Sequence, residues 1–287
     1  MQPFDYLAPD RLEDVLELVA PPDHDVTLLG GGTAAVLLMK QDLIAPGTVV
    51  DLAHVAELGG ITPQPDGGLR VGATCRLVEL EESPIVGSTY PAVARAAHGI
   101  GNVRVRAVAT VGGNLVHADP AQDLAPVLMT LDARVVLASR QGTRRLAVDA
   151  FYVDVMETVL RRDEVLTAVE LPPPPAGRRA AYLKFTPRSL EDYGTVNVAC
   201  ALVIEEAACR SAVLVLGGVG PTPIRIRAAE AVLAGYPMTD ARIAEAARLA
   251  AEGIEPWDDL RGSAAYKRAM ARVWTARVLT RLRGATA

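Results

Sequence analysis

The sequence of 287 residues predicts an α+β fold in two domains. A strand–helix–strand pattern opens the chain, and short strands, helices and glycine-rich turns follow it up to Pro172–Pro175. Three alternating strands and then three helices come after these prolines. Four consecutive prolines cannot continue a strand or a helix, so we place the domain boundary there. We expect domains at residues 1–175 and 176–287, the first divided into lobes of about 1–55 and 56–175.

The first lobe is predicted to be a βαβ unit preceded by a helix. The helix spans Asp10–Ala20, because apolar residues recur there at helical spacing, and Asp10 is its expected N-cap. A short buried strand at Val26–Leu29 leads into three glycines. A helix at Thr33–Gln41 and a strand at Thr48–Leu52 complete the unit.

The second lobe is expected to hold short elements around a glycine-rich segment. They are strands at Leu69–Gly72 and Val165–Leu171, helices at Arg76–Glu82 and Pro91–His98, and a hairpin of Ala133–Ala138 with Arg144–Val148. The glycine-rich segment, Gly99–Asn114, is predicted as loop.

The second domain is predicted to combine a three-stranded antiparallel sheet with a helical bundle. The strands are Ala180–Phe185, Val196–Ile204 and Ser211–Leu216. The helices are Arg227–Ala234, Thr239–Gly253 and Ser263–Arg283.

Composition narrows the classes of function. The net charge of -5 disfavours a nucleic-acid partner. The start of the chain lacks the pattern of a signal peptide, and its longest charge-free apolar stretches fall short of the roughly 20 residues of a spanning helix. We therefore expect a cytoplasmic protein without a membrane span.

Cysteine and histidine usage narrows the chemistry further. Cys75, Cys200 and Cys209 are too few and too scattered for a disulfide framework or for a four-cysteine iron–sulfur cluster held by this chain alone. We expect them to be buried as small apolar residues. We expect no metal site, and with no hydrolytic motif in the sequence we assign no catalytic acid or base.

The first glycine motif points to a diphosphate. Gly30–Ala35 has the pattern G-x-G-x-x-A between a strand and a helix, and Asp51 follows about 20 residues later, as in a dinucleotide-binding Rossmann fold. Glycines allow the backbone N–H groups to approach phosphate oxygens. The same pattern also fits a tight turn. A Rossmann domain would continue with alternating strands and helices, which residues 53–171 do not predict.

A second glycine cluster lies about 80 residues further along the chain. It comprises Thr110, Val111, Gly112, Gly113 and Asn114. Two such loops can hold one diphosphate from both sides, with Thr110 and Asn114 adding side-chain donors.

The order of these two motifs resembles the FAD-binding medium subunit of the molybdenum hydroxylases, a family that includes carbon monoxide dehydrogenase, N-heterocycle dehydrogenases and xanthine dehydrogenase. Gly30–Val36 stands in place of the family's first flavin loop, and Thr110–Asn114 matches its second loop. Ile100-Gly101, within Ile100–Arg106, is similar to the approach to that second loop. The resemblance covers essentially the whole chain and implies an FAD-binding domain of the vanillyl-alcohol-oxidase-like (PCMH) type.

The resemblance also implies a set of cofactor-binding residues. They are Leu29, Gly30, Gly31, Gly32, Thr33, Ala34, Ala35, Val36, Ile100, Gly101, Thr110, Val111, Gly112, Gly113, Asn114, Asp123, Leu166, Lys184 and Tyr193. Ala34 replaces a polar residue of the family, which leaves only backbone contacts there.

Four residues keep two interpretations each. Asp123 contacts the adenosine part of FAD or caps a helix. Lys184 contacts the flavin side or is solvated. Tyr193 stacks on the flavin ring or packs in the core. His117 approaches the flavin or lies at a helix end.

The function implied by the resemblance is electron transfer. FAD in this chain would accept electrons from [2Fe-2S] clusters of a small partner subunit and pass them to an external acceptor. The substrate would be hydroxylated in a large molybdopterin-binding subunit, in a dimer of heterotrimers. Two alternatives stay open: a self-contained NAD(P)-dependent oxidoreductase using Gly30–Ala35 and Asp51, and a non-catalytic assembly module.

Overall fold

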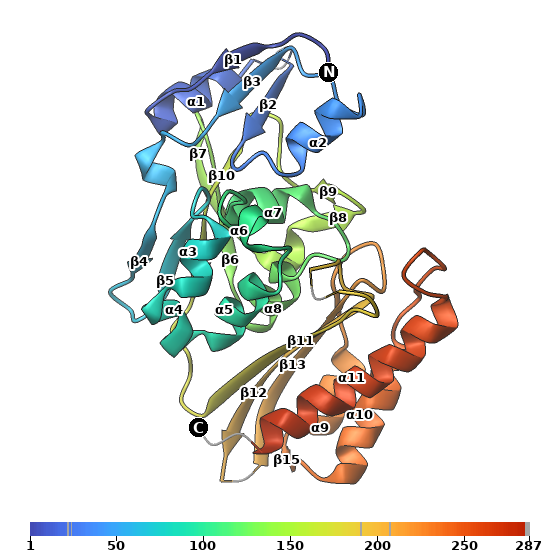
Figure 1. Ribbon diagram of the computed structural model, residues 1–287. Helices are drawn as coiled ribbons and strands as arrows, with labels where there is room; N and C mark the ends of the chain where they lie inside the picture. The colour runs from blue at the N-terminus through green and yellow to red at the C-terminus, as the bar shows by residue number, and fades with distance from the viewer. Residues whose placement is uncertain (22, 24, 190, 207, 285–287) are drawn as a thin grey trace.

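The three larger sheets of the described residues follow one another along the molecule, each with its own helices (Figure 1). The computed structural model describes residues 1–21, 23, 25–189, 191–206 and 208–284. The α+β class predicted from the sequence is confirmed. The positions of the lobe and domain boundaries stay predictions.

The first sheet holds three parallel strands in the order β1-β3-β2, which are Asp5–Leu7, Thr48–Asp51 and Val26–Leu29. The helices α1 (Leu12–Val19) and α2 (Ala35–Lys40) accompany it, so the predicted βαβ unit forms. The N-cap of α1 is Arg11 rather than Asp10, and its side chain makes no capping bond. Strand β1 was not predicted, because its three exposed residues show no apolar alternation.

The second sheet is antiparallel and has the strand order β4-β5-β10-β6-β7. Its strands are Ile61–Pro63, Leu69–Gly72, Val165–Leu171, Arg134–Ser139 and Gly142–Ala147. Its helices are α3 Leu77–Glu82, α4 Pro84–Thr89, α5 Pro91–His98, α6 Val103–Arg106, α7 Val111–His117 and α8 Leu124–Thr130. Short 3-10 turns at Ala56–Leu58 and Val148–Ala150 and a small hairpin of β8 (Tyr152–Asp154) with β9 (Glu157–Thr158) complete it. An antiparallel second sheet does not continue a Rossmann domain.

Four helices of this part, α4, α6, α7 and α8, were not predicted from the sequence. The second glycine cluster was expected to be a loop, but it begins helix α7, whose N-cap Thr110 accepts a bond from Gly113 N–H. Every residue of α8 is buried, so it shows no polar face from which a helical period could be read.

The third sheet is built on three long antiparallel strands, β11 (Arg178–Phe185), β12 (Val196–Glu205) and β13 (Ala208–Gly217). Two strands of two residues each, β14 (Ile224–Arg225) and β15 (Tyr236–Pro237), widen the predicted three-stranded sheet. The predicted helices are present as α9 Arg227–Leu233, α10 Asp240–Glu252 and α11 Ala264–Gly284.

Strands β11 to β13 are covered on both faces, by the second-lobe helices and by α9 to α11 (Figure 1). Alternation along β12 explains this arrangement: Ala199 and Ala201 join the core of the second lobe, while Val198 and Cys200 join the core beneath the C-terminal helices. The two halves of the chain therefore share packed apolar surface.

The three cysteines are buried, as expected for small apolar residues. Burial raises the pKa of the Cys75 thiol to about 12, so this side chain is unreactive near neutral pH. Of the helices in the described ranges, none is long and apolar enough to cross a membrane.

Candidate cofactor-binding site

A cavity of about 710 Å³ lies where the first lobe, the second lobe and the start of the third sheet meet. All the cofactor-binding residues inferred from the sequence line it except Val36 and Val111. The fold thus gathers residues that are up to about 160 positions apart in the chain, from Leu29 to Tyr193.

Asp51 is not part of this cavity, in contrast to the Rossmann interpretation. Its carboxylate accepts bonds from the Tyr6 hydroxyl at 2.6 Å and from Ala53 N–H at 2.9 Å. Strand β3 lies between β1 and β2, and Asp51 is therefore bound by the neighbouring strand β1.

The first glycine loop presents a row of free donors. Among the described residues, no protein acceptor takes a hydrogen bond from the backbone N–H groups of Gly30 to Ala34. Gly32 has a φ of +71°, a conformation that favours glycine. Gly31 packs so closely that a Cβ there would lie 1.8 Å from the Val108 carbonyl oxygen. The glycines are thus needed both for the turn and for its packing on the segment before α7.

Backbone N–H groups of the second glycine cluster, which were expected to bind a diphosphate, are hydrogen-bonded within the protein. Val111 N–H donates to Cys75 O at 2.9 Å, Gly112 N–H to Ala73 O at 2.8 Å, and Gly113 N–H to Thr110 Oγ1 at 3.2 Å. These donors are already satisfied, which argues against equal contributions from two glycine loops.

The second cluster has one polar side-chain atom that is buried without a hydrogen-bond partner in the described residues, the Oδ1 atom of Asn114. Asn114 lines the same cavity as the first loop. A buried acceptor without a partner is unfavourable, which indicates a place for a ligand donor.

A buried ion pair forms one wall of the cavity. Lys184 Nζ lies 3.2 Å from the Asp123 carboxylate and donates to Gly99 O at 2.8 Å. The Tyr182 hydroxyl also donates to Asp123. Burial raises the pKa of Asp123 to about 6, an effect that Lys184 and the Tyr182 bond oppose.

The ion pair bears on the non-cofactor interpretation of each residue. Asp123 is the N-cap residue of α8 but its side chain makes no capping bond, and the Lys184 side chain is 7% exposed rather than solvated. Contact of either residue with FAD stays a prediction. The resemblance assigned them to the adenosine and flavin parts of FAD respectively. As neighbours, they face the same end of the cavity.

Leu166, Tyr193 and His117 add apolar and aromatic surface. Leu166 is buried on β10, and His117 lies at the end of α7. Tyr193 is 45% exposed, with the Arg261 guanidinium 5.4 Å from its ring centre, so it is a rim residue rather than part of the core. Leu190, in the same loop as Tyr193, lies outside the described residues.

Sequence reasoning missed several polar residues of the cavity. They are Thr27, Thr74, Gln122, Arg161, Arg162 and Glu164. Gln122 is the most telling, because it is 2% exposed and both of its amide atoms lack a partner among the described residues. A long polar side chain beside Asp123, in a run 120–128 that is otherwise apolar apart from these two residues, is the signal that could have found it.

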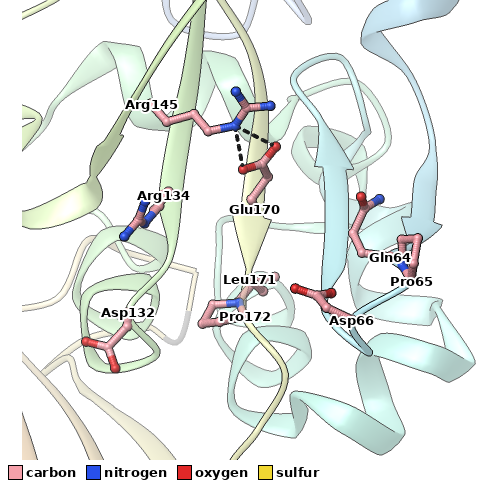
Figure 2. Close-up of a pocket in the computed structure, with 9 residues that line it drawn as sticks. All are labelled: Gln64, Pro65, Asp66, Asp132, Arg134, Arg145, Glu170, Leu171 and Pro172. Atoms are coloured by element: carbon pink, nitrogen blue, oxygen red, sulfur yellow. Dashed lines mark hydrogen bonds and ion pairs between the residues drawn. The ribbon is translucent and has the colours of Figure 1, made fainter.

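A second hollow of about 490 Å³ lies elsewhere on the second lobe, beside the ends of β10 and β6 (Figure 2). Its lining is charged, and Arg145 Nε lies 3.0 Å from Glu170 Oε2. Arg134 and Arg145 are exposed to solvent, where such pairs contribute little. None of the site residues inferred from the sequence lines it.

The main cavity is suited to bind a dinucleotide rather than to catalyse acid–base chemistry. Free backbone donors match a diphosphate, and unpaired amides match the polar edges of a ring. The buried Asp123 and Lys184 bind each other, so their charges are already compensated.

Comparison with known proteins agrees with this geometry. A protein-family model described as the FAD binding domain in molybdopterin dehydrogenase matches residues 2–174. A second one, described as the CO dehydrogenase flavoprotein C-terminal domain, matches residues 181–282.

Similar proteins match over nearly their full length. The 6-hydroxypseudooxynicotine dehydrogenase complex subunit alpha of Paenarthrobacter nicotinovorans is 32% identical, over 97% of this chain and 94% of its own. The carbon monoxide dehydrogenase medium chain of Afipia carboxidovorans is 30% identical, over 97% and 96%. A chain of reconstituted CO dehydrogenase from Oligotropha carboxidovorans superposes with a TM-score of 0.95 at 29% identity, with 99% of each chain covered.

Proposed function

This chain belongs to the FAD-binding subunits of the molybdenum hydroxylases, and we propose that it binds FAD and carries electrons within a larger oxidoreductase. Bound FAD would take electrons from the [2Fe-2S] clusters of a small partner subunit and give them to an external acceptor. The observation that carries the proposal is the row of free N–H groups at Gly30–Ala34, in residues that line a cavity of about 710 Å³.

The residues of this chain would bind and orient the cofactor. The first loop would hold the diphosphate, because backbone donors fixed in one direction stabilise negative charge without reorganisation. Asn114 Oδ1 would accept a hydrogen bond from the cofactor. Tyr193 at the rim and Leu166 in the wall would contact the rings.

The partners follow from the same family membership. We propose a large molybdopterin-binding subunit, which hydroxylates the substrate, and a small [2Fe-2S] subunit, in a dimer of heterotrimers in the cytoplasm. The similar proteins from Paenarthrobacter nicotinovorans and Afipia carboxidovorans are a complex subunit and a medium chain of dehydrogenases. No residue of this chain is assigned as a catalytic acid or base.

The two alternatives have less support. A nicotinamide site using Asp51 is disfavoured because that carboxylate is bound by Tyr6 and lies outside the cavity lining. A non-catalytic assembly module would not need free donors at Gly30–Ala34. Analysis of a denatured extract for FAD, FMN and NAD separates all three: FAD supports the proposal, NAD the first alternative and no cofactor the second.

Electron transfer is tested without oxygen. The isolated chain, loaded with FAD, should be bleached by an artificial reductant but not by an organic substrate or carbon monoxide. Addition of the proposed iron–sulfur and molybdenum partner subunits should restore bleaching by the substrate. Rapid bleaching of the isolated chain by substrate would instead place the catalytic centre in this chain.

A further inference from the structure

The Gln122 side chain is buried, and its amide makes no hydrogen bond of normal geometry. It is 2% exposed, and within the described residues neither its Oε1 nor its Nε2 has a partner at hydrogen-bond geometry, although the Tyr152 hydroxyl lies near it. It lines the cofactor cavity. Buried polar groups are nearly always paired, so this amide marks a position that a ligand would satisfy.

The backbone around Gln122 is fixed by the third sheet. Asn197 Nδ2, on β12, donates to Ala121 O at 2.9 Å and to Gln122 O at 3.2 Å. Gly218 N–H donates to Pro120 O at 2.8 Å. The segment that carries the amide is therefore held in place before any ligand binds.

Gln122 lines the same cavity as Lys184 and Tyr193. The next residue, Asp123, pairs with Lys184, and the strand of Lys184 leads into the loop of Tyr193. Burial, Asp119 and Asp123 together raise the pKa of the Tyr193 phenol, while Arg261 opposes the rise. Tyr193 therefore lies within electrostatic range of the segment 119–123.

We propose that Gln122 binds the polar edge of the isoalloxazine ring of FAD. This edge carries two carbonyl groups with a ring N–H between them. A primary amide can donate to a carbonyl and accept from the adjacent N–H at the same time, so the two edges are complementary. The proposal rests on the proposed binding of FAD and adds a binding residue that tunes the cofactor.

A partner within the protein is the competing explanation. The Tyr152 hydroxyl is buried and also lacks a hydrogen bond within the described chain. Burial raises the pKa of the Tyr152 phenol, and a hydrogen-bonding interaction with the Gln122 side chain opposes this rise, so the two groups lie within reach of each other. If they bind each other in solution, Gln122 is structural rather than a ligand for the cofactor.

The sign of a stability change separates these two roles. In the full chain without FAD, Gln122→Leu should raise the midpoint of thermal unfolding, because it removes a buried amide that has no partner. If Tyr152 satisfies the amide, the same substitution should lower that midpoint. Gln141→Leu, in the exposed turn between β6 and β7, is the matched control and should leave both stability and cofactor binding unchanged.

Cofactor binding gives the second readout. We expect Gln122→Leu to weaken FAD and riboflavin binding about tenfold, because two hydrogen bonds are lost, and to leave binding of ADP unchanged. The midpoint potential of the bound flavin should fall, since a donor to the ring carbonyls stabilises the reduced, more negative ring. Gln122→Met, which is unbranched and fits irregular space, serves if the leucine variant does not fold.

The outcomes keep the two proposals apart. If the wild-type chain binds no FAD, the proposed function fails. If the wild type binds FAD but both Gln122 variants bind it equally well and are less stable without it, Gln122 is structural and this inference fails. If the affinity for ADP falls together with that for FAD, the amide contacts the adenosine part and the assignment to the ring is wrong.

Discussion

Gly113 is a position where one substitution can separate cofactor binding from folding. It lies on the cavity wall, and among the described residues an added Cβ would come close only to Thr110 Oγ1, at 2.9 Å, so that this hydroxyl has to shift slightly. A carboxylate there would face the diphosphate held by the first loop and repel it. We therefore expect Gly113→Asp to abolish FAD binding while the thermal unfolding midpoint of the apoprotein changes little.

Gly113→Ala is the matched control for this substitution. It introduces the same Cβ without a charge and should retain most of the affinity for FAD. Flavin content after purification and a titration with FAD measure both variants. FAD occupancy of Gly113→Asp equal to that of the wild type would show that the diphosphate does not lie beside Gly113.

The ionisation of Asp123 should make the stability of the apoprotein depend on pH. Its pKa is about 6 in the folded chain and 3.8 in the reference state, so the native state holds the proton more tightly than the unfolded state. The free energy of unfolding should therefore fall as pH rises from about 4 to about 6, by on the order of 3 kcal/mol, and stay level with respect to this group above that.

Asp123→Asn cannot titrate and should lack this contribution. Urea unfolding at fixed ionic strength, at intervals from pH 4 to pH 7.5, measures the difference in slope between variant and wild type. The comparison of slopes cancels the contributions of other carboxyl groups, such as Glu164, whose pKa is lowered by its bond with Arg144. Parallel profiles for the two proteins would contradict the raised pKa.

At the scale of elements, strand β12 supports the cavity from outside. Asn197 is fully buried and bridges β12 to the carbonyl groups of Ala121 and Gln122. Asn197→Ala leaves these two carbonyls unsatisfied, so the free energy of unfolding should fall by about 2–4 kcal/mol. The affinity for FAD should fall as well, because the segment 120–123 loses its anchor.

Two measurements separate the effects of Asn197→Ala. Denaturant unfolding gives the stability, and an FAD titration under conditions where the variant is folded gives the affinity. As a control, Asn102→Ala removes a different asparagine, which caps α6 and lies outside the core. Unchanged FAD affinity in a destabilised Asn197→Ala would mean that the first two lobes fix the cavity without β12.

At the scale of the whole molecule, shared packing should make the chain unfold as one unit. Tyr182, Ala199 and Val215 of the third sheet belong to the same apolar cluster as the helices of the second lobe. FAD would contact residues from all three sheets, since Leu29, Leu166 and Lys184 line one cavity. We expect a single calorimetric transition that moves upward as a whole when FAD is added.

The size of that shift follows from mass action. At a free FAD concentration of 100 times the Kd, binding adds about 2.7 kcal/mol to the free energy of unfolding. Differential scanning calorimetry with increasing FAD measures it, and ATP at the same concentration is a control ligand. Two separate transitions, with only one of them shifted by FAD, would show that the halves unfold independently.

Local patterns in the sequence determined the regular elements and the first glycine loop. Strand β10 and helix α5 have the bounds predicted from the sequence, because β10 is a short apolar run buried on both faces, α5 packs one side on a core, and the flanking residues break each pattern. The resemblance carried by Gly30–Val36 and Thr110–Asn114 indicated the family and its cofactor before any contact was known. Helix α8 escaped prediction, since a helix buried on all sides has no period to read.

Only the tertiary structure decided how the site residues relate to one another. Asp123 and Lys184 lie 61 positions apart and form one ion pair, and nothing local in the sequence encodes that distance. In the second glycine cluster, the N–H groups of Val111 and Gly112 donate to the carbonyl groups of Cys75 and Ala73. The free backbone donors are therefore those of the first loop. Gln122 can be recognised as a site residue only from its burial and from the lack of a well-placed hydrogen-bond partner for its amide. Burial and pairing depend on segments that meet in space, so sequence spacing alone could not determine them.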